Sequence, residues 1–448
     1  MMRFDPHDPK YWDKKELDSE MTRVFEICNG CRLCDNLCPT FTDLFDRIEQ
    51  EDDKLTAIGR THDNPVLELV PADHKHAVDV CYQCKLCYPK CPYTPPHEYQ
   101  LDFPRLLLRA DAIRVKQKGK SFRHRLRDNF TGDADRIGNL SEKLTGLVNW
   151  ANRNSFTRFM MEKVLGIHRR KKLPVYYEET FRSWYDNHPI PRKPEPVDKV
   201  VLFYTCMVNN NKPWIGKQFI EILEQHNIEV LVPQQECCGM PELGTGQLEH
   251  VYAKVDRNVK RFSSLVDAGY KIIAMSPSCS MMMRTEYALY ATDKKAATKI
   301  QENVIDPCEY LMQLHRKKLL KADFPVSVAE KITYHVPCHL KVQNIGFQSR
   351  DLLKLLPNTE VKTAQYCSGH DGTWSMKEEY YEISLDVGKK LFNTIGREQP
   401  ATVVSDCSLA HLHITEGTGE DPLHPIEVLY EAMGLTAHLS QKKTHEAN

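Results

Sequence analysis

The sequence has no hydrophobic run of about 18 residues, so nothing in it predicts a membrane-spanning helix. Its first residues lack the apolar stretch of a secretory signal peptide, so we expect a protein that is not exported and whose thiols stay reduced. Lys and Arg number 60 against 61 Asp and Glu, which argues against a generally basic nucleic-acid binder. We therefore expect a cytoplasmic protein without a nucleic-acid partner, and leave open a peripheral contact with the inner face of a membrane.

Nucleotide-binding motifs are missing as well. Glycine accounts for only 20 of 448 residues, and no G-x-G-x-x-G follows a strand and opens a helix. A P-loop is absent, and so is the G-x-S-x-G elbow of a serine hydrolase. We therefore expect neither flavin nor NAD on this chain. If a dehydrogenase reaction is involved, a separate subunit should carry the flavin and the substrate site.

Cysteine, in contrast, is abundant: the chain has 16, and eight of them fall in two runs of the same form, C-x2-C-x2-C-x3-C-P. The first run contains Cys28, Cys31, Cys34 and Cys38, and the second contains Cys81, Cys84, Cys87 and Cys91. Three thiolates at x2 spacing can hold three corners of an iron–sulfur cube, while the x3 step and the proline turn the fourth away. In two-cluster ferredoxins that fourth cysteine binds the other cluster.

We therefore predict two [4Fe–4S] clusters with crossed ligands. The first takes Cys28, Cys31, Cys34 and Cys91, and the second takes Cys81, Cys84, Cys87 and Cys38. Zinc fits poorly, because zinc sites usually join two C-x2-C pairs across a longer gap. Two clusters that are close enough for electron tunnelling form an electron-transfer path. The alternative is a scaffold in which the clusters only stabilise a docking surface. Arg32 and Lys85, inside the loops, are interpreted as surface charges.

The segments around the two runs have helical patterns. They are MTRVFEI before Cys28, FTDLFDRIEQ after Pro39 and HKHAVDV before Cys81. The long spacer and these helices resemble the all-helical ferredoxin domain of succinate dehydrogenase iron–sulfur subunits and of heterodisulfide reductase small subunits. We assign this domain to residues 1–113.

Residues 114–196 form the expected connector. Arg114–Arg127 holds seven basic residues and no acid, and a second basic run covers Arg169–Lys172. Between them, apolar residues recur at helical spacing: Leu144, Leu147, Val148 and Ala151, then Phe156, Phe159, Met160 and Val164. One interpretation is a helical connector with a solvated basic face, and the other is contact with a membrane surface or an acidic partner. A linker is predicted at Pro174, Pro189, Pro191, Pro194 and Pro196.

From Val197 the pattern changes to alternating strands and helices, and it occurs twice. Cys338, Cys367 and Cys407 follow Cys206, Cys237 and Cys279 by 132, 130 and 128 residues. Each of these cysteines comes just after a predicted strand. Alternation of this kind predicts parallel or mostly parallel sheets, and ligands of such sheets gather beyond the carboxyl ends of the strands. We assign the two repeats to residues 197–325 and 326–448. The fold class is thus α/β multidomain, with a helical ferredoxin domain, a connector and a tandem repeat.

The repeat resembles the cysteine-rich CCG domain of heterodisulfide reductase catalytic subunits and glycolate oxidase iron–sulfur subunits. The first copy has Cys206, Cys237, Cys238 and Cys279, with Met282 at the family's last cysteine position. The second copy keeps Cys338, Cys367 and Cys407, with Ser368 and Ala410 at the other two. The resemblance implies a third iron–sulfur cluster or zinc in the first copy, and only a weak metal site in the second.

Three other residues have plainer interpretations. Cys308 fits an ordinary buried hydrophobe better than a ligand. His335 and His339, on either side of Cys338, are interpreted as hydrogen-bonded structural groups rather than ligands. We assign no catalytic residue from the sequence.

The order of domains resembles the family of C subunits of anaerobic glycerol-3-phosphate dehydrogenases. The resemblance implies an electron-transfer subunit that receives electrons from a flavin-bearing dehydrogenase partner, passes them through two [4Fe–4S] clusters and delivers them to a quinone or another acceptor. This would be a part of anaerobic respiration. The alternative is a heterodisulfide reductase-like oxidoreductase that acts on thiols or disulfides at a CCG-domain site.

Overall fold

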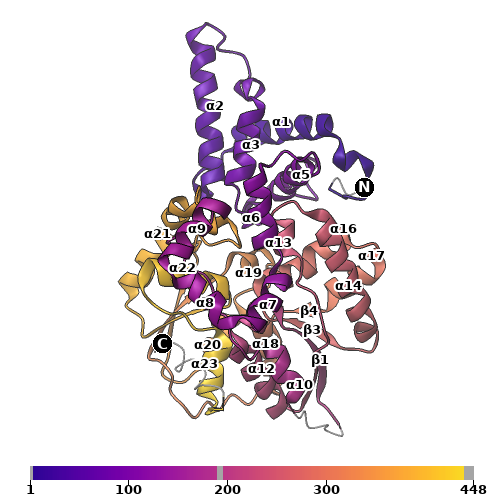
Figure 1. Ribbon diagram of the computed structural model, residues 1–448, viewed down its shortest axis with the longest axis vertical. Coiled ribbons are helices and arrows are strands. Elements are labelled where there is room, and N and C mark those ends of the chain that lie inside the picture. The colour runs from indigo at the N-terminus through magenta and orange to yellow at the C-terminus, as the bar shows by residue number, and fades with distance from the viewer. Residues whose placement is uncertain (1–3, 189–194, 438–448) are drawn as a thin grey trace.

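A computed structural model describes residues 4–188 and 195–437 of the chain. A helical amino-terminal part, a helical connector and an α/β part with two parallel sheets follow one another along it. The amino-terminal helices stand on one end of the α/β part, and α2 projects furthest from it (Figure 1). Three of the prolines expected in the linker, Pro189, Pro191 and Pro194, lie outside the described residues.

The amino-terminal part is helical, as the flanks of the cysteine runs predict. Its longer helices are α1 (Lys14–Cys31), α2 (Pro39–Ala57), α3 (Pro71–Val80) and α5 (Phe103–Lys116). The short ones are η1 (Pro9–Trp12), η2 (Asp35–Leu37), η3 (Pro65–Glu68) and α4 (Cys87–Lys90). The prolines that follow Cys38 and Val70 occupy the first turns of α2 and α3, where a helix needs no N–H donor. Apolar side chains of α1, α2 and α5 form one core, and cysteines of both runs pack at its edge.

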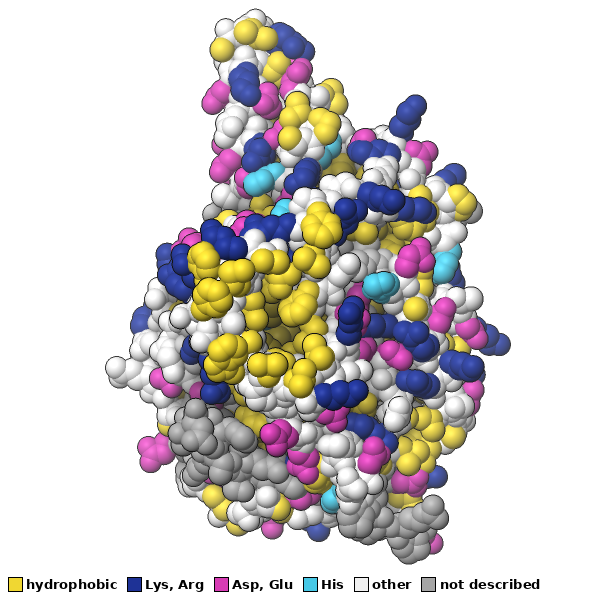
Figure 2. All heavy atoms as spheres, viewed as in Figure 1, with side chains coloured by type: hydrophobic (Ala, Val, Ile, Leu, Met, Phe, Trp, Pro, Cys, Tyr) yellow, Lys and Arg dark blue, Asp and Glu magenta, His cyan; other side chains and the backbone are white. Residues whose placement is uncertain are grey.

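The connector consists of short helices. They are α6 (Phe122–Gly132), α7 (Ala134–Lys143), α8 (Thr145–Arg153), α9 (Ser155–Leu165) and α10 (Phe181–Asn187). Many apolar side chains of α6–α9 face solvent, and they gather in a patch with a hollow at its centre (Figure 2). The predicted helical spacing of apolar residues is therefore present, but their face points outward.

The expected solvated basic face is wrong for most of the first basic run. Four of its seven cations form ion pairs, some with acids nearby in the chain and some with distant ones: Arg114 with Asp79 and Asp111, Lys120 with Asp111 and Asp128, Arg123 with Glu378, and Arg127 with Glu379. In the second run Lys171 is buried against Glu416. Most of these partners lie far away in the chain, so the local sequence did not reveal that the charges are neutralised.

The α/β part contains two sheets in which every pairing is parallel, in agreement with the predicted strand–helix alternation. The first has the order β2-β1-β3-β4, and the second has the order β6-β5-β7. The strands are β1 (Asp198–Phe203), β2 (Ile228–Leu231), β3 (Lys271–Ala274), β4 (Val304–Ile305), β5 (Lys331–His335), β6 (Glu360–Ala364) and β7 (Thr402–Ser405).

Helices follow the strands in the same order in both repeats. The first repeat has α11 (Thr205–Asn210), α12 (Pro213–Gln225), α13 (Met240–Leu243), α14 (Leu248–Asp267), α15 (Pro277–Met281), η4 (Met282–Glu286), α16 (Tyr287–Tyr290), α17 (Lys294–Asn303) and α18 (Pro307–Arg316). The second has α19 (Cys338–Val342), α20 (Gln348–Leu353), η5 (Trp374–Met376), α21 (Tyr381–Glu398), α22 (Ser408–Thr418) and α23 (Pro425–Ala432). None of the helices at residues 4–188 or 195–437 combines the length and the hydropathy that crossing a bilayer requires.

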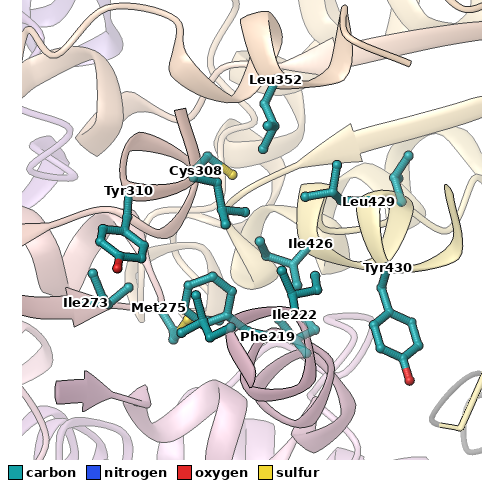
Figure 3. Close-up of a cluster of buried hydrophobic side chains, with 14 of the residues drawn as sticks. Phe219, Ile222, Ile273, Met275, Cys308, Tyr310, Leu352, Ile426, Leu429 and Tyr430 are labelled. Atoms are coloured by element: carbon teal, nitrogen blue, oxygen red, sulfur yellow. The ribbon is translucent and has the colours of Figure 1, made fainter. Parts of the chain in front are cut away.

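The two repeats share one hydrophobic core. Phe219 and Ile222 of α12 lie close to Ile426 and Leu429 of α23, so a helix of each repeat packs against a helix of the other (Figure 3). Cys308 of α18 belongs to this core and is fully buried, consistent with its interpretation as a buried hydrophobe. Because burial of apolar surface is shared, the repeats have a fixed relative orientation, and the carboxyl ends of their strands can form one composite site.

Candidate functional site

Both cysteine runs adopt tight loops. α1 ends at Cys31, and the next residue, Arg32, has a left-handed backbone with φ of 49°. In the second run Gln83 and Lys85 are left-handed too, with φ of 52° and 58°. A left-handed residue reverses the chain sharply, which is what cysteines three positions apart need if their sulfurs are to face a common point.

The last cysteine of each run lies beside the first three of the other run. Burial raises the pKa of the Cys28 thiol, and the nearby thiolates of Cys91, Cys34 and Cys31 raise it further. Cys38 instead lines a small cavity of about 20 Å³ together with Cys81, Cys84 and Cys87. The structure therefore brings together the two crossed sets of four thiols that the sequence predicts.

The chemistry of these donor sets fits an iron–sulfur cluster. Burial raises the pKa of Cys81 to about 12, and the Cys38 thiolate adds to the effect. Burial, with the charge of neighbouring thiolates, also raises the pKa of Cys84 and Cys87. Four thiolates so close together and so poorly hydrated repel one another, and they need a positive centre to be stable in the charged form that binds metal.

The four thiols of the first CCG repeat also meet. Cys206, Cys237, Cys238 and Cys279 line one cavity, and each thiol shifts the pKa of the next in that order. They follow the carboxyl ends of β1, β2 and β3, as expected for a parallel sheet. Met282, at the position of the missing fifth cysteine, is fully buried. Gly239, after the cysteine pair, has a left-handed φ of 90°, which explains a glycine at this point.

Charged groups surround this thiol cluster. The Asp135 carboxylate accepts a hydrogen bond from the backbone N–H of Cys237 at 2.9 Å. The Lys254 ammonium lies 2.8 Å from Asp135 and 2.6 Å from Glu242. Burial disfavours the charge of Lys254, but the thiolate of Cys237 and the two carboxylates raise its pKa above the ordinary value. Lys254 is therefore a fixed counter-charge for thiolates at this site.

The second repeat brings fewer thiols together. The sulfurs of Cys338 and Cys367 are 3.9 Å apart, and Cys407 lines the same cavity of about 50 Å³. The hydrogen bond from Cys338 lowers the pKa of Cys367 to about 7. His335 hydrogen-bonds the Ser405 hydroxyl at 2.9 Å, and His339 hydrogen-bonds the Ser278 hydroxyl at 2.9 Å. Both histidines thus have partners within the protein.

The second cysteine run lies between the thiol edges of the two repeats. Cys81 lines a cavity of about 390 Å³ together with Cys206, Cys237, Cys238 and Cys279. On the other side, Cys84 lines the cavity that holds the thiols of the second repeat. Tyr82, between these two cysteines, is buried, and its side chain helps to lower the pKa of the Cys367 thiol. One loop of the ferredoxin-type part therefore touches both candidate CCG sites.

The interpretation of Lys85 as a surface charge is wrong. Its side chain is only 6% exposed, and its ammonium lies 2.6 Å from the Glu286 carboxylate of η4. Asp371, which no sequence motif indicates, lines both cavities, and burial and the Cys367 thiolate raise its pKa to about 8. Tyr82 could have been noticed because it lies inside a cysteine run, whereas Asp135 and Glu286 have no local signal.

Comparisons with known proteins agree with this arrangement. The family model of the citrate utilization protein B Fer4-like domain matches residues 21–120, and the CCG cysteine-rich domain model matches residues 200–284 and 332–415. The C subunit of anaerobic glycerol-3-phosphate dehydrogenase from Escherichia coli (strain K12) is 28% identical over 394 residues, which cover 79% of this chain and 98% of the relative.

Two further relatives match shorter parts. The B subunit of fumarate reductase (CoM/CoB) from Methanothermobacter marburgensis is 30% identical over 241 residues, which cover 52% of this chain and 45% of that protein. Lactate utilization protein A 1 from Bacillus mycoides is 29% identical over 188 residues, which cover 40% of this chain and 74% of that protein. The chain is therefore a relative of the C subunit of anaerobic glycerol-3-phosphate dehydrogenase, with a Fer4-like domain followed by a tandem pair of CCG cysteine-rich domains.

Proposed function

We propose that this protein is the iron–sulfur electron-transfer subunit of an oxidoreductase complex. Two [4Fe–4S] clusters, bound by the crossed cysteine sets, would supply one-electron transfer between donor and acceptor. The protein's own contribution is position: it holds the second cysteine run against the thiol edges of both CCG repeats. The single observation that supports the proposal most is the pair of cavities that Cys81 and Cys84 share with the CCG thiols.

The donor and the acceptor are proposed from the relatives and from the cavities. We infer a flavin-bearing dehydrogenase partner of the glycerol-3-phosphate dehydrogenase kind, because the relative that matches 79% of this chain belongs to such an enzyme. The acceptor would be a quinone or another small molecule in the cavity of about 390 Å³, a volume within the usual range for ligand sites. The protein would be cytoplasmic and would contact the membrane from its inner face.

Electron paramagnetic resonance tests the electron-transfer proposal. Anaerobically purified protein, reduced with dithionite, should give iron–sulfur signals of two interacting clusters, and oxidation by a quinone analogue should abolish them. The reason is that both clusters belong to one conducting path. Clusters that are present by iron content but cannot be reduced would instead favour the scaffold alternative and would contradict the proposal.

Iron content tests the third site at Cys206, Cys237, Cys238 and Cys279. Two cubanes alone correspond to about eight irons per chain, and a further cluster raises this to about twelve. We expect about twelve in the wild type and a loss of about four in a Cys238→Ala variant, because that thiol lies beside both Cys237 and Cys279 in the cluster. Zinc is measured in the same samples. A Cys308→Ala variant, which changes a buried thiol outside the site, should keep its iron.

The alternative function, reduction of disulfides at a CCG site, has one observation in its favour. Cys338 and Cys367 lie 3.9 Å apart beside the second cysteine run, as a redox-active thiol pair could. This alternative predicts that a small disulfide oxidises the reduced clusters of the wild type and fails to oxidise those of a Cys367→Ala variant. Equal rates in the two proteins would reject it.

A further inference from the structure

The helices α6–α9 carry an unusual outward-facing apolar surface, here called the collar. Its most exposed members are Phe122, Leu140, Leu147, Trp150, Phe156 and Val164, and Phe122 and Phe156 are 74% and 69% exposed. These side chains come from four consecutive helices and surround a hollow in one face of the molecule (Figure 2). Contiguous apolar surface of this kind marks a site that binds a membrane or another protein.

The collar is not a by-product of poor packing, because the same helices bury polar residues on their other faces. Arg127 and Asp128 of α6 and Arg158 and Glu162 of α9 are all buried. Arg127 pairs with Glu379 at 2.7 Å, and the Arg158 guanidinium donates to the carbonyl of Lys171 at 2.8 Å. A helix at the surface of a water-soluble domain normally has the opposite orientation. The inversion therefore indicates an apolar medium outside the collar.

The charges around the collar indicate which medium. Six exposed cations lie on or next to α6–α9: Arg125, Arg136, Lys143, Arg153, Lys163 and Lys172. None of the six forms an ion pair with another described residue, and Glu142 is the one exposed acid of these helices. An apolar surface bordered by such cations matches the surface of an anionic bilayer, where headgroup phosphates lie next to hydrocarbon.

We propose that the collar inserts shallowly into the surface of an anionic lipid bilayer and holds the protein there without a spanning helix. This proposal rests on the membrane contact of the proposed function and names the surface that makes it. The collar, rather than the basic run Arg114–Arg127, would touch the bilayer. α6 connects the collar to the candidate redox site, because His124, Arg127 and Asp128 on the same helix line the cavity of about 390 Å³. A bilayer-dissolved acceptor would therefore meet the protein one helix away from the cavity.

Vesicle flotation of the full-length holoprotein tests the proposal. The probes are vesicles of phosphatidylethanolamine with phosphatidylglycerol and vesicles of phosphatidylcholine alone. Wild-type protein should float with the anionic vesicles, and a Leu147→Ser/Trp150→Ser variant should bind them at least about tenfold more weakly, since two inserted side chains are lost. The matched control is Ile58→Ser, which changes a side chain that is similarly exposed but lies just after α2, and it should bind like the wild type.

A second measurement does not depend on how well the double variant folds. In the wild type, brominated phospholipids should quench part of the tryptophan fluorescence, because Trp150 would lie in the hydrocarbon region. A Trp150→Phe variant should still float but lose this quenching. Absence of flotation by the wild type overturns the proposal. Equal flotation of the wild type and the Leu147→Ser/Trp150→Ser variant overturns it too, because binding would then rest on surface charge alone.

These outcomes are independent of the proposed electron transfer. The collar variants should keep the iron content and the reducible signals of the wild type, because the collar side chains are not among the cysteine ligands. If the wild type does not bind vesicles but the collar variants lose assembly with a purified flavoprotein partner, the collar is a protein interface and the bilayer proposal is wrong. Loss of reducible signals in the wild type would reject the proposed function and leave the vesicle result unaffected.

Discussion

A Cys28→Ala/Cys91→Ala double variant is expected to lose about four irons per chain, whereas Cys81→Ala/Cys91→Ala is expected to lose about eight. The physical reason is the crossing of ligands. The Cys91 thiolate lies beside Cys28, Cys34 and Cys31, so Cys28 and Cys91 would serve the same cluster. Cys81 lies beside Cys38 in the other set, so its loss together with Cys91 affects both clusters. Iron and acid-labile sulfide per chain provide the measurement.

The opposite pattern of iron loss in the two double variants would show that the ligands are not crossed. If each run held a cluster of its own, Cys28→Ala/Cys91→Ala would remove both clusters and Cys81→Ala/Cys91→Ala only one. Electron paramagnetic resonance of the surviving cluster shows whether the remaining site is intact. A Cys308→Ala variant controls for the general effect of removing a buried thiol, because Cys308 lies in the shared core of the repeats. Equal iron loss in the two double variants would reject crossed ligation.

Much of this architecture can be predicted from the sequence because it depends on local spacing and on repetition. The x2 spacings limit three thiols to one loop, and the positions of Cys206, Cys237 and Cys279 relative to apolar segments locate the ends of three strands. In a parallel sheet those ends share one edge, so the cysteines had to gather there. The second repeat supplied an independent copy of the same pattern. Its partial loss of thiols is visible in the sequence too.

The parts that the sequence did not predict depend on distant partners. Lys85 and Glu286 are 201 residues apart in the chain, and no local feature shows that the two side chains meet in a buried site. Similarly, the apolar spacing of α8 and α9 predicts an amphipathic helix correctly but does not say whether its apolar face points inward. That direction depends on whether polar groups elsewhere, such as the Lys171 carbonyl that accepts from Arg158 of α9, can bind the other face.

Breaking the Lys85–Glu286 ion pair is also expected to have a large effect, here on the stability of the fold. A Glu286→Gln variant is expected to lower the free energy of unfolding by about 3–5 kcal/mol, because it leaves the Lys85 ammonium buried without a counter-charge. Arg105, 3.3 Å from the same carboxylate, loses a partner as well. Urea unfolding followed by circular dichroism and by cluster absorbance measures the effect. The control is Glu302→Gln, an exposed side chain that has no ion pair among the described residues.

The pKa of Glu286 determines how the difference in unfolding free energy between the wild type and Glu286→Gln depends on pH. Burial alone would raise it, but Arg105 and Lys85 lower it from 4.5 to about 2. Because the carboxyl has a lower pKa in the folded state than in the unfolded state, its charge stabilises the folded state fully at any pH above the unfolded-state pKa. This stabilisation is lost as the pH falls through the folded-state pKa. The difference between wild type and Glu286→Gln should therefore stay constant between about pH 6 and pH 8. A difference that changes over this range would mean that another titrating group controls the contact.

A double variant separates the charge of this contact from its shape. Replacing Lys85 by methionine removes the buried ammonium, so Glu286→Gln/Lys85→Met should recover part of the stability that Glu286→Gln loses. Lys85 also lies inside the second cysteine run, between Cys84 and Cys87. If the pair mainly anchors this loop against η4, the double variant should regain stability while the resonance signal of the second cluster still differs from the wild type. A fully wild-type signal would show that packing alone positions the loop between the two CCG edges.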